Sequence, residues 1–311
     1  MRGRRGPQPK PWAFIALLAI LIAVILFGVD YYRHRFVRSD ADMLALLPTQ
    51  DATIFFVNVD ALRRAGVLGL ITGSKHTQEP DYQEFVRQTR FDYANSLQRI
   101  AGAADGNQVF LVIRGRFDWS KLRQYAIAHG GRCTKSICSA LTSKSGDWMS
   151  LVLIQGDVIG VALSSNATAA EALRPAGRRL AEPPPLRAAW VKISPNLLKK
   201  PLSLPVPLRI FAISLESADA VLVSLGPAGD GSEAAFELRL DARCPSPATA
   251  ETIRNQLEIE TKMLKLGLAR KHQQPNPSDL TGLLTSGTFE AIQREVIGRW
   301  PLRKEFLKAM Q

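Results

Sequence analysis

The side chains of this chain best suited to acid–base, nucleophilic or metal chemistry are four histidines and three cysteines. None of the histidines has a second ligand at the spacing of an H-E-x-x-H zinc site. They are His34, His76, His129 and His272. The chain also lacks the G-x-S-x-G turn of many hydrolases and the G-x-G-x-x-G loop of dinucleotide-binding domains. We therefore expect no catalytic residue, no metal and no cofactor, and favour a protein that is not an enzyme.

Two of the cysteines are close enough in sequence to bond to each other. Cys133 and Cys138 enclose Thr-Lys-Ser-Ile and follow the glycine pair 130–131, a pattern that predicts a short hairpin. Residues that flank a tight hairpin have Cα atoms about 4.5–5.5 Å apart, within disulfide range. In an oxidising compartment they would form a bridge; the alternative is a pair of unpaired, small apolar side chains. Only Cys244 is left over, so a second zinc-binding pair is missing.

Two arginines stand at matching positions, each directly after a predicted strand. Arg116 follows the strand VFLVIRG and Arg243 follows FELRLDA. The repetition allows two interpretations. The two guanidinium groups could form a twofold-related anion-binding pair, or each could cap a helix or stack on a neighbouring side chain.

The elements that must position these residues occur twice. Residues 53–64 begin with the alternation of apolar and polar side chains that is typical of a strand, and they continue as a helix. The stretch RAAWVKISPNLLKK at 187–200 shows the same pattern. In this comparison Val57 corresponds to Val191 and Val59 to Ile193. The later strands at 109–115 and 236–242 also correspond.

Each of these later strands is followed by a predicted helix. Asp118 is the expected N-cap of the first helix, and Ser246, followed by Pro247, is that of the second. Each half thus has the order strand, helix, strand, turn, strand, helix. This order predicts an α+β fold of two tandem, duplicated, split βαβ (ferredoxin-like) halves with antiparallel sheets. The alternative is two unrelated α+β segments.

The predicted domain boundaries follow from this repeat. The first half spans 47–180, a proline-rich linker spans 181–186, and the second half spans 187–311. The first half adds a hairpin that turns at Gly156 and Asp157. The second half is expected to end in helices over 279–300 and 301–310, which are interrupted at the Trp300–Pro301 bond.

Residues 12–29, WAFIALLAILIAVILFGV, predict a transmembrane helix that is not cleaved. The stretch has no charged residue, and at about 1.5 Å per residue it makes a helix close to the roughly 30 Å of a bilayer core. No small-x-small cleavage site follows it closely. Aromatic and basic side chains at both ends are the expected membrane-interface anchors. They are Lys10, Trp12, Tyr31, Tyr32 and Arg33.

Charge sets the expected orientation of this helix. The tail 1–11 holds four basic residues and no acid, against three basic residues just after the helix. By the positive-inside rule the tail is cytoplasmic, residues 30–46 form a juxtamembrane stalk, and the bulk of the chain is extracytoplasmic. Its partners are then the lipid bilayer and an envelope protein.

The formal net charge of +12 does not indicate a nucleic-acid-binding protein. Half of the excess lies in residues 1–38, where seven basic residues and one acid give +6 beside the predicted membrane segment. No nucleic-acid-binding motif accompanies the rest, which we interpret as a solvated basic surface. We expect no nucleic-acid partner.

The motifs LLPTQDATIFFVNVDALR, RGRFD and DLTGLLTSGTF, placed after the membrane segment, carry one resemblance. The chain resembles uncharacterised bacterial single-span membrane proteins whose outer portion opens with LLP-x-x-A. The resemblance covers most of residues 46–311 and has no catalytic residues to transfer. It implies a single-pass protein of the bacterial inner membrane.

Three functional hypotheses follow. The first is a membrane-anchored, extracytoplasmic module that binds a ligand or scaffolds an envelope assembly without catalysis. The second is a cell-envelope hydrolase with a site between the halves, near the prolines at 183–185. The third is a basic domain that faces the cytoplasm and is held on anionic lipid.

A topology reporter separates the third hypothesis from the others. We expect a reporter that is active only outside the cytoplasm to be active when fused after Gln311, because the N-terminal charges hold the tail inside. A silent fusion that is expressed at normal level would instead favour the cytoplasm-facing domain. Non-reducing mass spectrometry of the native protein supplies a second readout, since two free thiols at Cys133 and Cys138 would also count against export.

Overall fold

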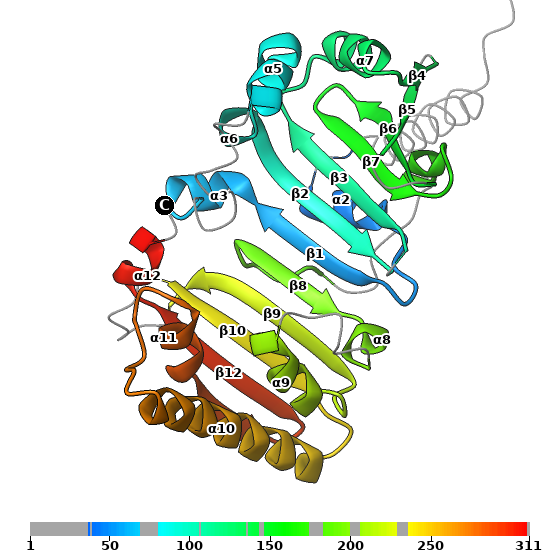
Figure 1. Cartoon of the computed structure of the whole chain (residues 1–311). Coiled ribbons are helices and arrows are strands. Elements are labelled where there is room, and N and C mark those ends of the chain that lie inside the picture. The colour runs from blue at the N-terminus through cyan, green and yellow to red at the C-terminus, as the bar shows by residue number, and fades with distance from the viewer. Residues whose placement is uncertain are drawn as a thin grey trace, which may run out of the picture.

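A computed structural model describes residues 37, 39–68, 80–105, 107–134, 136–142, 146–173, 183–199, 206–228 and 236–309. Within these residues one sheet of 12 strands runs through the molecule, in the order β11-β12-β10-β9-β8-β1-β2-β3-β7-β6-β5-β4 (Figure 1). Every neighbouring pair in it is antiparallel. The fold is therefore α+β, as expected, with a single large sheet in place of the two separate sheets that the repeat predicted.

The strands are β1 (Thr53–Asn58), β2 (Leu97–Ala104), β3 (Val109–Gly115), β4 (Arg132–Cys133), β5 (Ile137–Leu141), β6 (Trp148–Gln155), β7 (Val158–Ser164), β8 (Ala189–Ile193), β9 (Ala220–Pro227), β10 (Phe236–Arg243), β11 (Thr288–Ile292) and β12 (Glu295–Leu302). The helices are α2 (Asp40–Ala45), α3 (Val59–Arg64), α5 (Pro80–Thr89), α6 (Tyr93–Ser96), α7 (Trp119–Ala128), the 3-10 helix η2 (Ala169–Leu173), α8 (Pro195–Leu198), α9 (Val206–Ser214), α10 (Pro247–Arg270), α11 (Leu280–Thr285) and α12 (Lys304–Ala309).

The two halves meet where β1 pairs with β8. In this register Phe56 lies opposite Trp190 and Ile54 lies opposite Lys192. The Phe56 and Trp190 rings stack with centroids 6.1 Å apart. The backbone N–H of Asn58 extends the ladder by donating to the carbonyl of Ala188 at 2.7 Å.

The same strand order occurs in both halves, but it is not that of a split βαβ unit. The first half runs β1-β2-β3-β7-β6 and the second runs β8-β9-β10-β12-β11; the β5–β4 hairpin is an addition at the edge of the first. A split βαβ unit separates the two strands that flank its first helix. Here β1 and β2, which are joined through helices, are direct antiparallel neighbours.

The alignment of the two halves differs by two residues from the sequence comparison. Asn58 caps α3 and Ser194 caps α8, so these two residues are equivalent. The sequence correspondence of Val59 with Ile193 would instead match Ser194 with Asp60. Because a strand repeats every two residues, a shift of two leaves its apolar pattern unchanged, and only the caps reveal the correct register.

The C-terminal region holds a hairpin where helices were expected. Among the described residues from 279 to 309, only α11 and α12 are helical, and between them β11 and β12 turn at Gln293, whose φ is 54°. Alternation in TFEAI and EVIGRW favours strands, and β12 pairs fully with β10. This hairpin is the counterpart of β6–β7, where the turn at Gly156 and Asp157 was predicted correctly.

The two hydrophobic cores lie on opposite faces of the sheet. One core joins α2 and η2 to the face that carries Phe56 and Trp190. The other joins α10 to the face that carries Val221. Val221 pairs with Ile193, three residues from Trp190, and successive side chains alternate between faces. Figure 1 shows α9, α10 and α11 on the near face and α2 behind the sheet.

The folded body begins before the end of the expected stalk at 30–46. Ser39 caps α2 with a capping box, and Met43 and Leu44 are buried in the core. The amide of Gln155 holds Val37 on both sides, accepting from its N–H at 2.9 Å and donating to its carbonyl at 3.1 Å. Folding therefore extends back at least to Val37, because these apolar side chains complete the first core.

The predicted membrane span lies outside the described residues, as do the anchors Lys10, Trp12, Tyr31, Tyr32 and Arg33. Of the helices that the structure describes, none is both long enough and apolar enough to cross a bilayer.

Gly102 lies in β2, next to the β1–β8 pair where the two halves meet, and its substitution tests the packing there. Its cross-strand partner is Phe55, and a Cβ on Gly102 would lie 2.1 Å from Cζ of that ring. We expect Gly102→Ala to lower the free energy of unfolding by about 1–3 kcal/mol through overpacking, measured by chemical denaturation.

Two further variants control this experiment. Adding Phe55→Leu should recover part of the loss, since it removes the atoms that clash. Gly156→Ala should change stability by less than about 0.5 kcal/mol, because a Cβ there meets nothing within 4 Å. An equal loss at both glycines would contradict the packing argument.

Candidate functional site

A groove lies on the far face of the sheet, where the first half meets the second. Its cavity volume is about 640 Å³, within the range of small-molecule sites. The walls come from the end of α2, from strands β1, β8, β9, β10 and β12, and from the linker. The lining residues are Leu44, Thr49, Ile54, Pro183, Pro184, Pro185, Trp190, Lys192, Ala220, Val221, Leu222, Asp241, Ala242, Arg243 and Glu295.

The register of the sheet explains why these side chains meet. Ile54, Lys192, Leu222 and Asp241 are successive partners on β1, β8, β9 and β10, so they form one row across four strands. Side chains of one such row point to the same face of a sheet. Residues more than 180 positions apart in the sequence therefore share this surface.

The floor of the groove is apolar and includes one buried donor without an acceptor. Trp190 is only 7% exposed, and its indole N–H has no hydrogen-bond partner within the described structure. Ile54 and Leu222 lie partly buried beside the same core. The floor therefore offers an apolar surface around a buried aromatic ring.

The rim of the groove carries charges of both signs. Asp241 is held by Arg239, whose Nε donates to the two carboxylate oxygens at 2.8 and 3.0 Å. This hydrogen bond raises the pKa of the Arg239 guanidinium, so Asp241 keeps a permanent counter-charge. Arg243 and Glu295 are cross-strand partners in β10 and β12.

Two cations of the rim have no such counter-charge. For the described residues, no carboxylate lies within ion-pair distance of Lys192 or Arg243. Both side chains are exposed. They are the groups best placed to meet an anionic part of a ligand.

The prolines at 183–185 form one wall of the groove. Proline fixes φ near −65°, so three in succession make a stiff, extended segment. They lie in the chain just before β8, which carries Trp190 and Lys192. The second sequence hypothesis had placed its site near these same prolines.

The groove shows little that could perform catalysis. The described lining includes no histidine, cysteine or serine, and one hydroxyl, that of Thr49. Across the described parts of the chain, no cluster of three or more His, Cys, Asp or Glu could hold a metal ion. The arrangement is suited to binding by apolar contact and charge.

The titratable groups that burial perturbs lie outside this groove. Burial raises the pKa of Glu260 in α10, which accepts a hydrogen bond from Ser214 at the end of α9 at 2.6 Å. Burial also raises the pKa of the Cys244 thiol. Neither residue lines the groove, so neither supplies it with a poised acid or nucleophile.

The structure separates the arginines that the sequence paired. Arg116 Nη2 donates to the carbonyl of Asn95 at 2.5 Å, at the end of α6. Arg243 lies in the groove, and Arg116 is not among its lining residues. Arg116 thus has a structural contact, and only Arg243 is placed at the candidate site.

The described histidines also lie apart from the groove lining. His129 stacks on Tyr125 with centroids 4.0 Å apart and contacts its carbonyl through Nδ1 at 2.9 Å. His272 follows α10 with a φ of 53°. His34 and His76 are outside the described residues.

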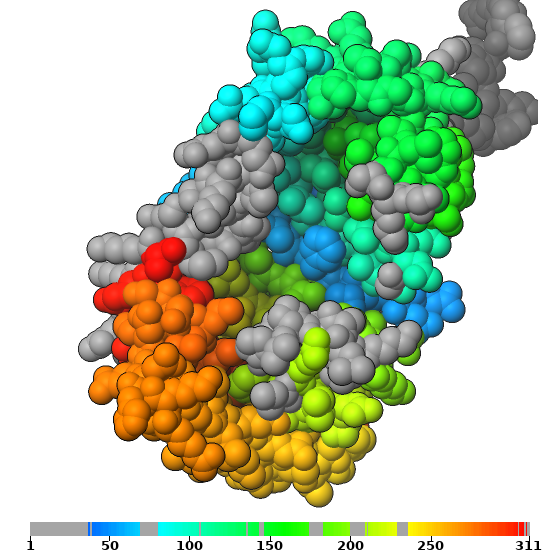
Figure 2. Space-filling model, in the orientation of Figure 1, coloured from blue at the N-terminus to red at the C-terminus, as the bar shows by residue number. Residues whose placement is uncertain are grey.

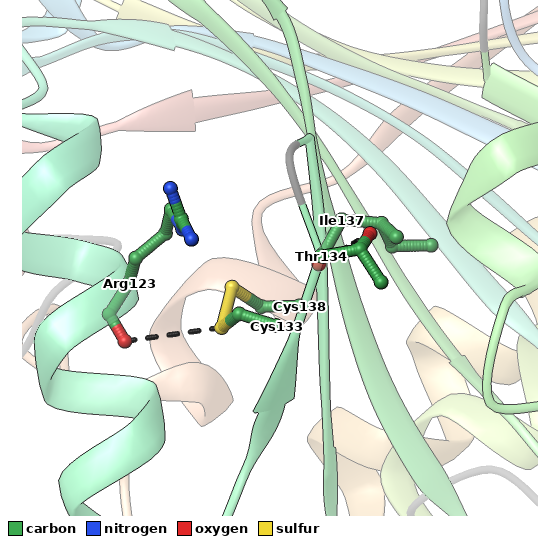
Figure 3. The surroundings of a disulfide bond; sticks show 5 residues. All are labelled: Arg123, Cys133, Thr134, Ile137 and Cys138. Atoms are coloured by element: carbon green, nitrogen blue, oxygen red, sulfur yellow. Dashed lines mark hydrogen bonds between the residues drawn. A yellow bond between two sulfur atoms is a disulfide. The ribbon is translucent and has the colours of Figure 1, made fainter.

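Cys133 and Cys138 are joined by a disulfide in the β4–β5 hairpin, where they are direct cross-strand partners (Figure 3). Their Cα atoms are 4.0 Å apart. Sγ of Cys133 also lies 3.8 Å from the carbonyl oxygen of Arg123 in α7. The disulfide therefore closes the edge of the sheet against α7.

Comparison with known proteins identifies no family. No protein-family model and no curated protein matches the chain. Among solved structures, crystal form I of TP0453 gives a TM-score of 0.49 at 10% identity over 88% of this chain and 98% of that one. Crystal form III gives 0.49 at 12% identity over 88% and 100%. The resemblance to single-span proteins stays a prediction.

Glu260 provides a pH-dependent test of the packing between α9 and α10. Its folded pKa lies above the unfolded value, so its contribution to stability is present at low pH and is lost as pH rises through the folded pKa. Glu260→Gln should therefore unfold at a higher temperature than the parent at neutral pH. The difference should shrink in mildly acidic buffer, where the glutamate is protonated.

The control for this experiment is Glu216→Gln, at an exposed carboxylate just after α9. Its thermal midpoint should follow that of the parent at every pH. If the Glu260→Gln chain is less stable than the parent at neutral pH, burial of the charged carboxylate does not destabilise the fold.

Proposed function

We propose that this chain is a single-pass, membrane-anchored binding module whose folded body lies outside the cytoplasm of a bacterium. It binds a ligand in the groove where the two halves meet, and it does not transform that ligand. The observation that carries the proposal is the groove of about 640 Å³, with an apolar floor and a charged rim.

The anchor in this proposal is the apolar segment 12–29, with the N-terminus in the cytoplasm. Its length and lack of charge support a span of the inner membrane. Seven residues, 30–36, separate it from Val37, which is the first described residue. Even fully extended they reach roughly 25 Å, so the body is held close to the bilayer surface.

The ligand that best fits the groove has an apolar body and an acidic group. Ile54, Trp190 and Leu222 provide the apolar contact, which gains about 25 cal/mol per Å² of surface removed from water. Lys192 and Arg243 provide the cations. Asp241 does not oppose an acidic group strongly, because Arg239 already neutralises it.

A hydrolase remains the competing hypothesis. It needs a nucleophile, or a base that activates water, in reach of the bound ligand. The described lining offers the carboxylates of Asp241 and Glu295, and the first of these is engaged with Arg239. The engagement of Asp241 supports binding over hydrolysis.

The repeated strand order supports an origin by duplication of one α+β unit. The unit is a five-stranded antiparallel order that occurs on each side of the β1–β8 pair. The groove then exists only in the duplicated chain, because the rows of side chains that line it cross from one half to the other.

Binding of an aromatic anion tests the groove. We expect the full chain in lipid nanodiscs to bind anilinonaphthalene sulfonate saturably, above the signal of empty nanodiscs. In Lys192→Glu/Arg243→Glu the dissociation constant should rise at least about tenfold, or about 1.4 kcal/mol, because both cations are replaced by repelling charges.

The matched control reverses two exposed arginines elsewhere, Arg87→Glu/Arg132→Glu, which changes the net charge equally. This control should bind the probe like the parent. An equal loss of affinity in both double variants would mean that net charge alone attracts the probe. Unchanged affinity in both would rule out the groove as the binding site.

A further inference from the structure

The longest described helix, α10, has a second apolar surface that faces solvent. Ile259, Met263 and Leu266 are 57%, 60% and 55% exposed. Their i, i+4, i+7 spacing places them on one side of the helix. Ile253 and Leu257, which are fully buried, belong to the opposite side, which packs on the sheet.

This solvent-facing stripe is continued by the neighbouring helix. In α9, Ile213 is 55% exposed. The next residue, Ser214, bonds to Glu260, which is adjacent to Ile259. Figures 1 and 2 show α10 and α9 together on the near, outer side of the second half, where α10 lies along the margin of the molecule.

Charge divides α10 into an acidic first part and a basic last part. Residues 247–259 hold Glu251 and Glu258 against Arg254, which pairs with both, a net charge of −1. The next acid, Glu260, faces Ser214 of α9. Residues 261–270 hold only basic charges, a net of +3. These are Lys262, Lys265 and Arg270. The apolar stripe spans the boundary between the two parts.

We propose that the stripe on α10 binds the α10 of a second copy of this chain, antiparallel, with a twofold axis between Ile259 and Met263. A twofold axis brings the acidic part of each helix against the basic part of the other and buries the two stripes between them. Glu258 of one copy then faces Lys265 of the other, twice. The surface is thus self-complementary in charge as well as in apolar contact.

Other partners fit this surface less well. An anionic bilayer would attract the basic part and repel Glu251 and Glu258. A parallel arrangement of two copies would set like charges against each other along the whole helix. Only the antiparallel arrangement places opposite charges together at both ends.

The expected interface is modest in size. A helix of 24 residues is about 36 Å long, and two such helices bury less than a typical stable interface of about 800 Å² per partner. We therefore expect a weak dimer that forms where the chain is concentrated. The test uses the full chain in its own membrane.

Cysteine cross-linking in membranes tests the proposal. Met263→Cys, placed near the axis, should form a disulfide-linked dimer under mild oxidation, seen on a non-reducing gel at twice the mass of the chain. Ile127→Cys is the matched control, on α7 and 53% exposed, and should remain monomeric. The remaining native thiol, Cys244, is buried and should not cross-link.

Charge reversal then tests the antiparallel register. Glu258→Lys added to Met263→Cys should reduce the cross-linked fraction several-fold, and adding Lys265→Glu to the same chain should restore it. The proposal is overturned if Met263→Cys gives no dimer or no more than Ile127→Cys. It is overturned equally by an adduct with a protein of another mass, or by a dimer that both charge variants leave unchanged.

Discussion

The antiparallel pairing of β1 with β8 is the interaction on which the rest of this structure depends. Alone, each half would end in an open edge strand whose N–H and C=O groups invite pairing with another chain. Pairing the two strands merges both halves into one sheet, and β4 and β11 become the outer strands of its described part. The stacked rings of Phe56 and Trp190 lie directly over this seam.

The seam also decides where a ligand can bind. Helix α10 of the second half covers the face of the sheet opposite to that covered by α2 in the first. The far face of the second half consequently carries the charged residues of β10, among them Arg239 and Asp241. The groove arises at the boundary, where the apolar core of one half meets the charged surface of the other.

The two halves differ outside their common strand order. The first half has a helix of 10 residues, α7, and an added β4–β5 hairpin closed by the disulfide. The second has in the equivalent place a helix of 24 residues, α10, which provides the solvent-facing apolar stripe. These features lie away from the β1–β8 pair that joins the halves.

Local patterns in the sequence were enough to predict most elements of this fold. Alternation of apolar side chains predicts β3 and β10. Capping preferences predict the N-caps Asp118 and Ser246, and turn chemistry predicts the turn at Gly156. The C-terminal hairpin was missed because Thr288–Ile292 is short, and brief apolar runs do not separate strands from helices. The alignment of the halves was displaced by two residues, since a period of two cannot detect such a shift.

The candidate site could be located from the sequence only as a neighbourhood, the prolines between the halves. By itself the sequence determined the α+β class, the internal repeat and the closeness of Cys133 to Cys138, because each depends on residues near one another in the chain. Only the tertiary structure decided that the two sheets are one and that Ile54, Lys192 and Asp241 share a surface. Strand pairing over such separations depends on which edges meet in space, and no local pattern encodes that choice.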